Sequence, residues 1–451
     1  MGKILLVCPE PIRQRIQGVG IRFLEMAQEL KRSGHEVSLW VPNDDIPKSR
    51  PEWIQPVWSP SFRRALRSCD AVVLHGHISE LYFSVLEAEG LGDGPPLVVD
   101  LYDPFPIENL QYTSYLGDGL YERDRAVLVR QLQAGDFFLT SSAIQRLFYI
   151  GGLVGLGRLK PALYREDPSL HSWITVVPFG VRPIERQKLE SLPGKIKGVL
   201  SGVNKDDVVV FFGGVYDWYD RMLVLEAAAP FIQAGCPMRI IFCENPNPDT
   251  TPQKRLLHVR RWADERGWMN RHVFVIPWFP YEDRFHYYRD VDIAVSLHCP
   301  SLETDLSLRT RLLDYMNAGL PIIATQGGEG SAKVVEAGAG VVIPPGNSTR
   351  LREALHGFLS DEGRRRLCGE QGRRWVQTHM RWDQSLHPLV RFCQAPRKCA
   401  IGAHPLTLQP SSSGENLIQL RSLIQELRRY RSTYGLGATV RRMWRLWGKG
   451  I

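Results

Sequence analysis

The chain has 451 residues, of which 43% are hydrophobic and 23% are charged. This length exceeds one ordinary hydrophobic core and fits two α/β domains, and the composition is that of a globular protein. The net charge is +8, but residues 415–451 carry eight cations against two acids, so the body is nearly neutral, which argues against a nucleic-acid-binding body.

We expect no targeting or membrane-spanning segment in this chain. No run of 18 apolar residues occurs, and Met1-Gly2-Lys3 leads directly into an apolar run rather than a cleavable signal. The eight cysteines are scattered and form no CxxC pair, which favours buried free thiols over a metal or redox site. We therefore expect a cytoplasmic protein that needs no metal or other cofactor.

The first half of the chain alternates apolar runs with helical patterns. An apolar run over 3–8 is followed by a loop containing Gly18-Val19-Gly20, an amphipathic helix over 21–33 and a second strand over 37–41. Further strands are predicted at residues 71–74, 97–99, 137–139 and 174–177. Strands that alternate with helices indicate a parallel, doubly wound sheet.

The second half repeats this pattern. Its predicted strands lie at residues 208–212, 239–243, 273–277, 293–297, 321–324 and 340–343. The fold class is therefore α/β, with two Rossmann-like domains and the ligand site expected in the cleft between them.

The predicted boundaries follow from these patterns. They are a first domain at 1–185, a linker at 186–198, a second domain at 199–378, one helix over 380–393 within a segment 379–395 that returns to the first domain, a linker at 396–415 and a basic helical tail at 416–451.

Residues 302–325 are the most informative segment, reading as a loop, a helix, a Gly-Leu-Pro stop and a strand. A helix start offers unpaired backbone N–H groups, so the turn Ser307-Leu308-Arg309-Thr310 suits a diphosphate, and Arg309 and Arg311 add positive charge. Asp314, one turn further, suits the vicinal hydroxyls of a ribose or a sugar. The alternative is a solvated or salt-bridged helix start.

Two glycine pairs follow apolar strands. Gly213 and Gly214 would let backbone approach a pyrophosphate, or form a plain tight turn. Gly18, Val19 and Gly20, with Arg22 at the helix start, could form an opposing acceptor or phosphate loop, although one G-x-G is weak by itself.

Titratable side chains also follow strands of the first half. Asp103 could orient an acceptor hydroxyl or accept its proton, or it could cap the next turn. His75 and His77 end a strand and face either a cleft or the protein interior.

Taken together, several motifs resemble the GT-B-fold glycosyltransferases of retaining family 4, also called group 1. The resemblance covers roughly residues 1–395. Its anchors are Gly18-Val19-Gly20, Gly34-His35-Glu36-Val37, the run from Val176 to Val181, Gly213-Gly214 and the run from Asp314 to Pro321.

This resemblance implies that the second domain binds a nucleoside-diphosphate sugar and the first binds the acceptor. Donor-binding residues would be Gly213, Gly214, Trp218, the Ser307–Thr310 turn, Arg311 and Asp314, and Asp103, His77 and Glu303 are the catalytic candidates. Retention by front-face return would need no protein nucleophile.

The chain departs from the family at two places. Asp314 occupies the second of two expected glutamate positions and Leu306 the first, for which Glu303 could substitute. No cation follows Gly213-Gly214 before Arg221, so Arg309 or Arg311 would have to bind the diphosphate. The pattern looks like a subgroup of bacterial envelope-polysaccharide clusters.

The tail, 416–451, interleaves apolar residues with arginines and contains Trp444 and Trp447. It suits an anionic membrane surface at the inner face of the plasma membrane, or else a protein-docking or disordered segment. We expect a retaining hexosyltransferase that acts on a saccharide or lipid-linked saccharide. The alternatives are a non-catalytic GT-B scaffold or partner subunit and a nucleotide-sugar epimerase.

Overall fold

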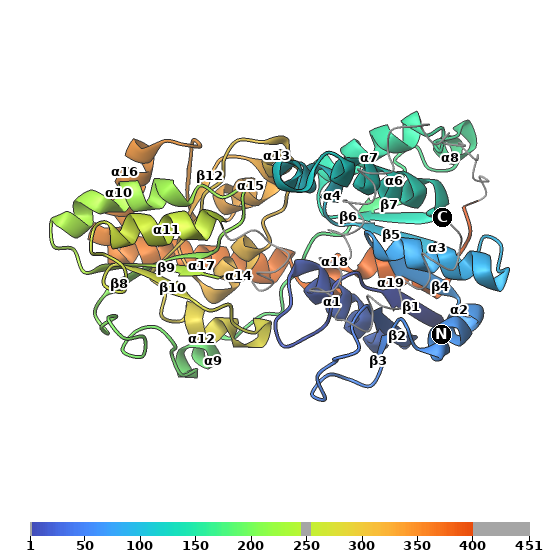
Figure 1. The fold of residues 1–451 in the computed structure, drawn as a ribbon, viewed down its shortest axis with the longest axis horizontal. Helices are drawn as coiled ribbons and strands as arrows, with labels where there is room; N and C mark the ends of the chain where they lie inside the picture. Colours follow the sequence, from blue (N-terminus) through green and yellow to red (C-terminus); the bar gives the residue numbers. More distant parts are fainter. Residues whose placement is uncertain (1, 245–253, 400–451) are drawn as a thin grey trace. The chain divides into compact units, whose positions relative to one another are not determined.

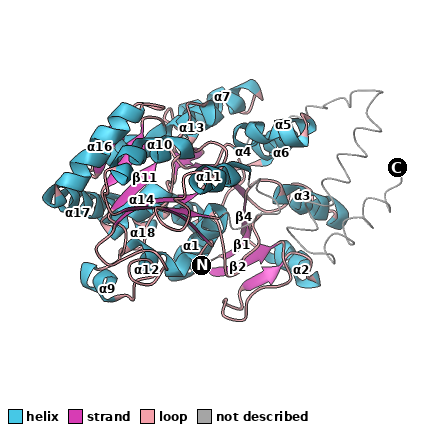
Figure 2. Cartoon of the chain, turned by 60° about the vertical axis from the view of Figure 1, so that its left-hand side comes forward, coloured by secondary structure: helices cyan, strands magenta, loops and turns pink. Residues whose placement is uncertain are grey.

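The structure of the protein is a computed structural model that describes residues 2–244 and 254–399 (Figure 1). The chain divides into two compact units. Unit 1 contains residues up to Pro178 together with the segment from Leu386, and unit 2 contains Phe179–Ser385. Helices lie on both sides of the strands of each unit (Figure 2).

Unit 1 is built on a seven-stranded sheet in the order β3-β2-β1-β4-β5-β6-β7, and every pairing in it is parallel. The strands are β1 (Lys3–Val7), β2 (Glu36–Val41), β3 (Ile54–Pro56), β4 (Ala71–Leu74), β5 (Leu97–Leu101), β6 (Phe137–Thr140) and β7 (Ile174–Val176). The central strands are buried on both faces, as expected for a sheet covered by helices.

The helices of unit 1 connect and cover these strands. They are α1 (Gly18–Arg32), α2 (Pro60–Ser68), α3 (Ile78–Glu89), α4 (Phe105–Glu108), η1 (Asn109–Tyr112), α5 (Thr113–Leu116), α6 (Gly119–Ala134), α7 (Ala143–Gly155), α8 (Pro161–Glu166) and α19 (His387–Gln394). The last of them packs through Phe392, whose ring stacks 4.6 Å from that of Phe137.

Unit 2 has a six-stranded parallel sheet in the order β10-β9-β8-β11-β12-β13. Its strands are β8 (Val208–Gly214), β9 (Met238–Cys243), β10 (Val273–Ile276), β11 (Ile293–Ser296), β12 (Ile322–Thr325) and β13 (Gly340–Ile343). In both units the strand order reverses beside the first strand. This places the expected ligand crevices between β1 and β4 and between β8 and β11.

The helices of unit 2 surround this sheet. They are α9 (Arg186–Ser191), α10 (Arg221–Gln233), α11 (Lys254–Asp264), η2 (Tyr281–Asp283), α12 (Arg284–Tyr288), α13 (Leu302–Leu306), α14 (Arg311–Ala318), α15 (Gly328–Glu336), α16 (Ser348–Ser360), α17 (Glu362–His379) and α18 (Trp382–Ser385).

The two ends of unit 2 lie together within the unit. Val181 bridges Arg381, and the ring of Phe179 packs 4.6 Å from that of Trp382. Between them, Gly180 leaves no room for a side chain, since a Cβ there would lie 2.7 Å from the Trp382 backbone nitrogen. The chain therefore enters and leaves this unit at one place.

The predicted fold class, two Rossmann-like parallel-sheet domains, is confirmed. Two local predictions were wrong. Gly18, Val19 and Gly20 form the first turn of α1 instead of a loop. The single helix expected over 380–393 is two helices, because Arg381 joins the bridge to Val181 and Pro388 favours a new first turn in α19. Most of the predicted linker at 396–415 and the whole tail, 416–451, lie outside the described residues.

Candidate active site

The carboxyl end of β8 meets the first turn of α14 in unit 2. Gly213 adopts a φ of 79°, a left-handed conformation that favours glycine. A Cβ on this residue would lie 3.2 Å from the Tyr315 hydroxyl and 3.3 Å from Nη1 of Arg311. The absence of a side chain therefore lets the β8 backbone approach this arginine closely.

Arg311 is the first residue of α14 and points back toward this strand end. Its Nη1 donates to the carbonyls of Phe212 and Gly214, at 3.1 Å each, and its guanidinium lies 4.2 Å from the centre of the Tyr219 ring. The residue is half-buried, and none of the carboxylates in 2–244 and 254–399 forms an ion pair with it. Its positive charge is therefore available to an anion at the start of α14.

Asp314 lies one turn further along α14. Its Oδ1 accepts a hydrogen bond from Nε of Arg284 at 3.1 Å. Nη1 of Arg284 in turn donates a hydrogen bond to the Tyr281 carbonyl at 2.8 Å. Burial raises the pKa of the Asp314 carboxyl, while the charge of Arg284 opposes this shift. The remaining acceptor sites of the Asp314 carboxylate can accept hydrogen bonds from the hydroxyl groups of a ligand.

Glu303 is buried in α13 and pairs with Arg309. Arg309 Nη1 donates to Glu303 Oε1 at 2.7 Å and Nη2 donates to Oε2, in the two-pronged geometry typical of arginine and carboxylate. Ser307 Oγ also donates to Glu303 Oε1 at 2.7 Å. Because the Arg309 side chain is only 7% exposed and is neutralised by this carboxylate, Arg311 is the better candidate for a diphosphate.

The predicted diphosphate-binding turn, 307–310, also contains Leu308 and Thr310. Leu308 is buried in the core, and Thr310 is the N-cap residue of α14 without a side-chain capping bond. The helix ends at Gly319, which adopts the left-handed conformation just before Pro321, as the Gly-Leu-Pro stop predicted.

Aromatic rings line the neighbouring strand end. The Trp218 and Tyr216 rings are stacked with centroids 4.9 Å apart, and the Tyr219 ring lies 4.8 Å from that of His298. Burial, together with the charges of Arg309 and Arg311, holds the pKa of His298 well below its usual value. His298 is therefore neutral at physiological pH and can accept or donate a hydrogen bond.

Two residues of this cluster, Arg284 and His298, were not among the predicted site residues. His298 directly follows the predicted strand over 293–297, so its position after an apolar run was a usable signal. Arg284 lies in the short helix α12 and meets Asp314 only through the tertiary fold, and no sequence pattern marks that pairing.

In unit 1, the N-terminus of α1 already holds an internal carboxylate. Glu10 accepts hydrogen bonds from the backbone N–H groups of Gln17 and Gly20, the latter at 2.6 Å. Burial raises the pKa of Glu10 to about 7, although both hydrogen bonds act in the opposite direction. The Gly18-Val19-Gly20 turn is therefore filled by the protein's own side chain.

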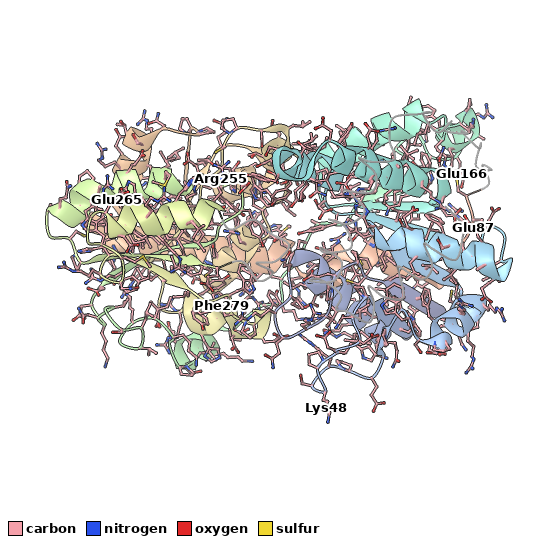
Figure 3. The ribbon with its side chains drawn as sticks, in the orientation of Figure 1. Lys48, Glu87, Glu166, Arg255, Glu265 and Phe279 are labelled. Carbon is pink, nitrogen blue, oxygen red and sulfur yellow. The ribbon has the colours of Figure 1, made fainter. Side chains whose placement is uncertain are left out.

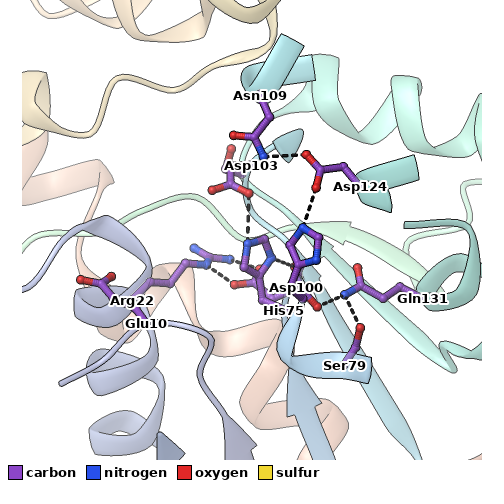
Figure 4. Close-up of polar contacts among 12 residues, drawn as sticks. Glu10, Arg22, His75, Ser79, Asp100, Asp103, Asn109, Asp124 and Gln131 are labelled. Atoms are coloured by element: carbon purple, nitrogen blue, oxygen red, sulfur yellow. Dashed lines mark hydrogen bonds and ion pairs between the residues drawn. The ribbon is translucent and has the colours of Figure 1, made fainter. Parts of the chain in front are cut away.

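Arg22 is likewise paired with another side chain of unit 1. It forms a fully buried ion pair with Asp100 through two hydrogen bonds, of 2.7 and 2.9 Å. Figure 4 shows this pair beside Glu10 and His75. Arg22 thus anchors α1 to the end of β5 instead of presenting a free cation.

The ends of β4 and β5 bring the catalytic candidates of unit 1 together (Figure 4). His75 Nε2 lies 3.0 Å from Asp103 Oδ1, and Nδ1 lies 2.6 Å from the Asp100 carbonyl. Burial acts to lower the pKa of His75, but the Asp103 carboxylate outweighs it and raises the pKa to about 9. The partly exposed Asp103 is therefore kept next to a cation.

His77 belongs to a second pair in the same region. Its Nε2 lies 2.6 Å from Oδ1 of the buried Asp124, whose other oxygen accepts from Asn109 at 2.6 Å. The His77 side chain is about half-exposed, so it is held in one orientation and still reachable.

Two kinds of feature are absent from the part of the chain that the structure describes. Within residues 2–244 and 254–399, no group of three or more His, Cys, Asp or Glu side chains is arranged to hold a metal ion. Across the same ranges, none of the helices has the length and apolar character required to cross a bilayer.

Comparison with protein families finds one matching domain. Residues 206–361, which run from just before β8 to the end of α16, match the family described as Glycosyl transferases group 1. A search of curated proteins found no match to this sequence.

Solved structures resemble the chain over most of its length. Sucrose-phosphate synthase from Thermosynechococcus elongatus has a TM-score of 0.59 at 14% identity, covering 87% of this chain and 98% of that one. Anabaena HepE in complex with UDP and glucose has a TM-score of 0.61 at 12% identity, covering 88% and 100%. WaaG, a glycosyltransferase involved in lipopolysaccharide biosynthesis, has a TM-score of 0.58 at 13% identity, covering 87% and 100%. These similarities show the GT-B fold.

Proposed function

We propose that the chain is a glycosyltransferase that moves a sugar, with retention of configuration, from a nucleoside-diphosphate sugar to a saccharide or lipid-linked saccharide. The proposed setting is envelope-polysaccharide synthesis in the cytoplasm, with the basic tail 416–451 at the inner face of the plasma membrane. The observation that carries the proposal is Arg311, a half-buried cation without a carboxylate partner among the described residues, at the first turn of α14 and beside Gly213.

In this proposal unit 2 binds the donor. The diphosphate lies against the backbone of Gly213 and Gly214, the Arg311 guanidinium and the first N–H groups of α14. Asp314 accepts hydrogen bonds from hydroxyls of the ribose or the sugar. The matching domain at residues 206–361 and the UDP bound in the Anabaena structure support a nucleotide sugar as the donor class.

Charge stabilisation is the main chemical task in this reaction. When the glycosidic bond breaks, negative charge develops on the departing diphosphate, and fixed donors in a shielded site can lower the barrier by several kcal/mol. Arg311 and the α14 amides supply that positive charge from the protein itself, so we propose transfer without a divalent cation.

In this proposal unit 1 binds the acceptor. Asp103 is partly exposed at the end of β5, where it can orient an acceptor hydroxyl or receive its proton. His75 lies 3.0 Å from Asp103 and orients its carboxyl group, and His77 offers a second oriented group nearby. Glu303 acts as a positioning residue through Arg309.

The test is a thermal-shift and donor-hydrolysis screen of the full chain against UDP-, GDP-, dTDP- and ADP-sugars. Ligand at a hundredfold excess over Kd stabilises the folded state by ~2.7 kcal/mol, which gives a clear rise in Tm. We expect one nucleotide to stand out, with slow sugar release that EDTA does not abolish.

The variant Arg311→Gln tests whether Arg311 binds the diphosphate of the donor. Loss of one charge-assisted contact should weaken donor binding by roughly tenfold or more, or about 1.4 kcal/mol. Arg366→Gln, on the exposed face of α17, is the matched control and should leave binding unchanged.

Two other results would overturn the proposal. No Tm shift with any nucleotide sugar would support a non-catalytic scaffold or partner subunit. Conversion of the nucleotide sugar into its epimer, without sugar release or transfer, would support an epimerase.

A further inference from the structure

The N-terminus of α1 lies where a doubly wound sheet often receives a phosphate group. Helix α1 follows β1, and the strand order of unit 1 reverses between β1 and β4. A helix that begins beside such a crevice offers its first N–H groups and its positive end to an anion. In this chain the carboxyl group of Glu10 occupies that position and accepts hydrogen bonds from the N–H groups of Gln17 and Gly20. The protein therefore supplies its own acidic group at this helix end.

Two glycines in the first turn of α1 make room for protein side chains. A Cβ on Gly20 would lie 3.0 Å from the carboxyl group of Glu10. A Cβ on Gly18 would lie 2.9 Å from the hydroxyl oxygen of Tyr102. The two glycines thus let Glu10 and Tyr102 approach the helix end, and these side chains fill the space that a phosphate would need.

The cation in the second turn of α1 is also neutralised. The side chain of Arg22 is fully buried, and its guanidinium donates to both carboxylate oxygens of Asp100, which is fully buried as well. Breaking this pair to bind a ligand would leave Asp100 as an uncompensated buried charge, which is strongly unfavourable. Neither the helix end nor Arg22 is therefore available to a phosphate (Figure 4).

The cations of the neighbouring loops lie nearer the surface. Arg13 pairs with Asp45 at 2.8 Å, and Arg50 donates to the Arg13 carbonyl at 2.9 Å. Lys48 is exposed in the loop after β2 and points away from unit 1 (Figure 3). Arg15 is exposed in the loop between β1 and α1. An anion attracted to this loop would therefore be held by Arg15 at the surface and not at the strand ends.

Two groups that do reach solvent at the strand ends suit hydroxyls. The side chain of Asp103 is 24% exposed, and that of His77 is 52% exposed. The Asp103 carboxyl group accepts hydrogen bonds, and Nε2 of His77 is fixed by Asp124 at 2.6 Å, which leaves Nδ1 for a ligand. Sugar hydroxyls can bond to both groups without bringing a charge to this edge of the sheet.

We propose that Glu10 excludes phosphate groups from the strand ends of unit 1, so that the acceptor enters as an uncharged sugar recognised through its hydroxyls. A phosphate at the start of α1 would meet a carboxylate instead of free N–H groups and would be repelled by it. This inference rests on the proposed function, because it names the class of acceptor for the same site. For a lipid-linked saccharide, the sugar end and not the phosphate enters unit 1.

The first experiment measures anion binding without any sugar transfer. It uses the full chain in an Arg311→Gln background, which removes the phosphate contact proposed for unit 2. Tm is recorded with and without about 20 mM inorganic phosphate at about pH 8, above the value of about 7 to which burial raises the pKa of Glu10. Two substitutions are added to this background: Glu10→Ala frees the N–H groups of α1, and Glu52→Ala is a matched loss of an exposed carboxylate.

Phosphate ions stabilise folded proteins by being excluded from their surface, and this effect should be equal in the background and in Glu52→Ala. We expect Glu10→Ala to gain a further rise in Tm of roughly 2 °C or more, because phosphate binds the vacated helix end. An equal rise in all three proteins would overturn the proposal. So would a phosphate-dependent rise in the background that Arg15→Gln leaves intact and Glu10→Ala does not increase, since phosphate would then bind despite Glu10.

The second experiment compares acceptors in the wild type, using the donor found in the nucleotide-sugar screen, and so remains decisive if Glu10→Ala does not fold. Methyl glycosides of common hexoses are compared with the 6-phosphates of the same sugars. We expect kcat/KM to be roughly tenfold or more higher for the uncharged sugar, and Glu10→Ala to narrow this ratio, which a purely structural role of Glu10 would not do. A preference for the phosphorylated sugar would overturn the proposal. A failed donor screen would remove the proposed function, whereas the phosphate measurement would still decide the role of Glu10.

Discussion

At the scale of single residues, the pair of His75 and Asp103 makes a prediction about pH. The pKa of His75 is raised to about 9, so the folded state binds a proton that the unfolded state releases near its ordinary value of 6.5. The stabilisation is fully present below pH about 6.5 and is lost as pH rises through about 9.

The measurement compares the wild type with His75→Gln. We expect the difference in their free energies of unfolding to fall by up to roughly 3 kcal/mol as pH rises between these limits. His171→Gln, at an exposed position in unit 1, is the control for the loss of a histidine and should change the free energy of unfolding little. A His75→Gln difference that stays constant with pH would contradict the protonated pair.

The residue scale also shows which parts of the candidate site were predictable. Arg311 and Asp314 were identified because a helix start, an Arg and an Asp one turn later are local features of one segment. The partners of these groups depend on contacts between distant segments, as in Glu303 with Arg309 and Arg284 with Asp314. The role of Glu10 at α1 was missed for a related reason, since nothing in its local sequence marks it as a helix cap.

At the scale of elements, the crossing of α14 and α17 depends on two glycines. A Cβ on Gly369 would lie 2.0 Å from the Gly319 carbonyl oxygen, so the backbones of the two helices touch there. We expect Gly369→Ala to force the helices apart and to lower the free energy of unfolding by about 1–3 kcal/mol.

The control for this substitution is another helical glycine with free space around it. A Cβ on Gly151 in α7 would have no neighbouring atom within 4 Å. Gly151→Ala should therefore raise stability by about 0.5–1 kcal/mol, because alanine has less freedom in the unfolded chain. Chemical denaturation of both variants measures the two effects, and a Gly369→Ala protein as stable as wild type would contradict the close crossing.

Strand positions were predicted best where a strand is fully buried and its residues form a continuous apolar run in the sequence. The central strands are buried runs of four to seven residues, and their hydrophobicity marks them. The edge strand β3 was missed because it has three residues, one of them Pro56, and therefore lacks a clear apolar run. The break between α18 and α19 depends on the bridge of Arg381 to Val181, which is distant in sequence.

At the scale of the whole molecule, the alternation of strands and helices was enough to predict two doubly wound domains. Right-handed parallel connections allow few arrangements for such a pattern, and the strand orders found here are among them. The sequence did not indicate that Ile144, Leu147 and Val154 of α7 are exposed. The residues of this helix follow an ordinary amphipathic spacing, and only the fold shows that polar Gln145 is on the buried side.

The meeting of the two ends of unit 2 has a practical consequence. Because the chain enters at Phe179 and leaves after Trp382 at the same place, residues 179–385 behave as an insert carried within unit 1. Such a cassette should fold when expressed by itself and could be transplanted between scaffolds. We expect the isolated fragment to unfold in one cooperative transition, and to be stabilised by the same nucleotide sugar as the full chain. A fragment that aggregates, or that unfolds without cooperativity, would show that residues 179–385 need unit 1 in order to fold. A fragment that folds and binds the same nucleotide sugar would show that this unit alone determines which donor is bound.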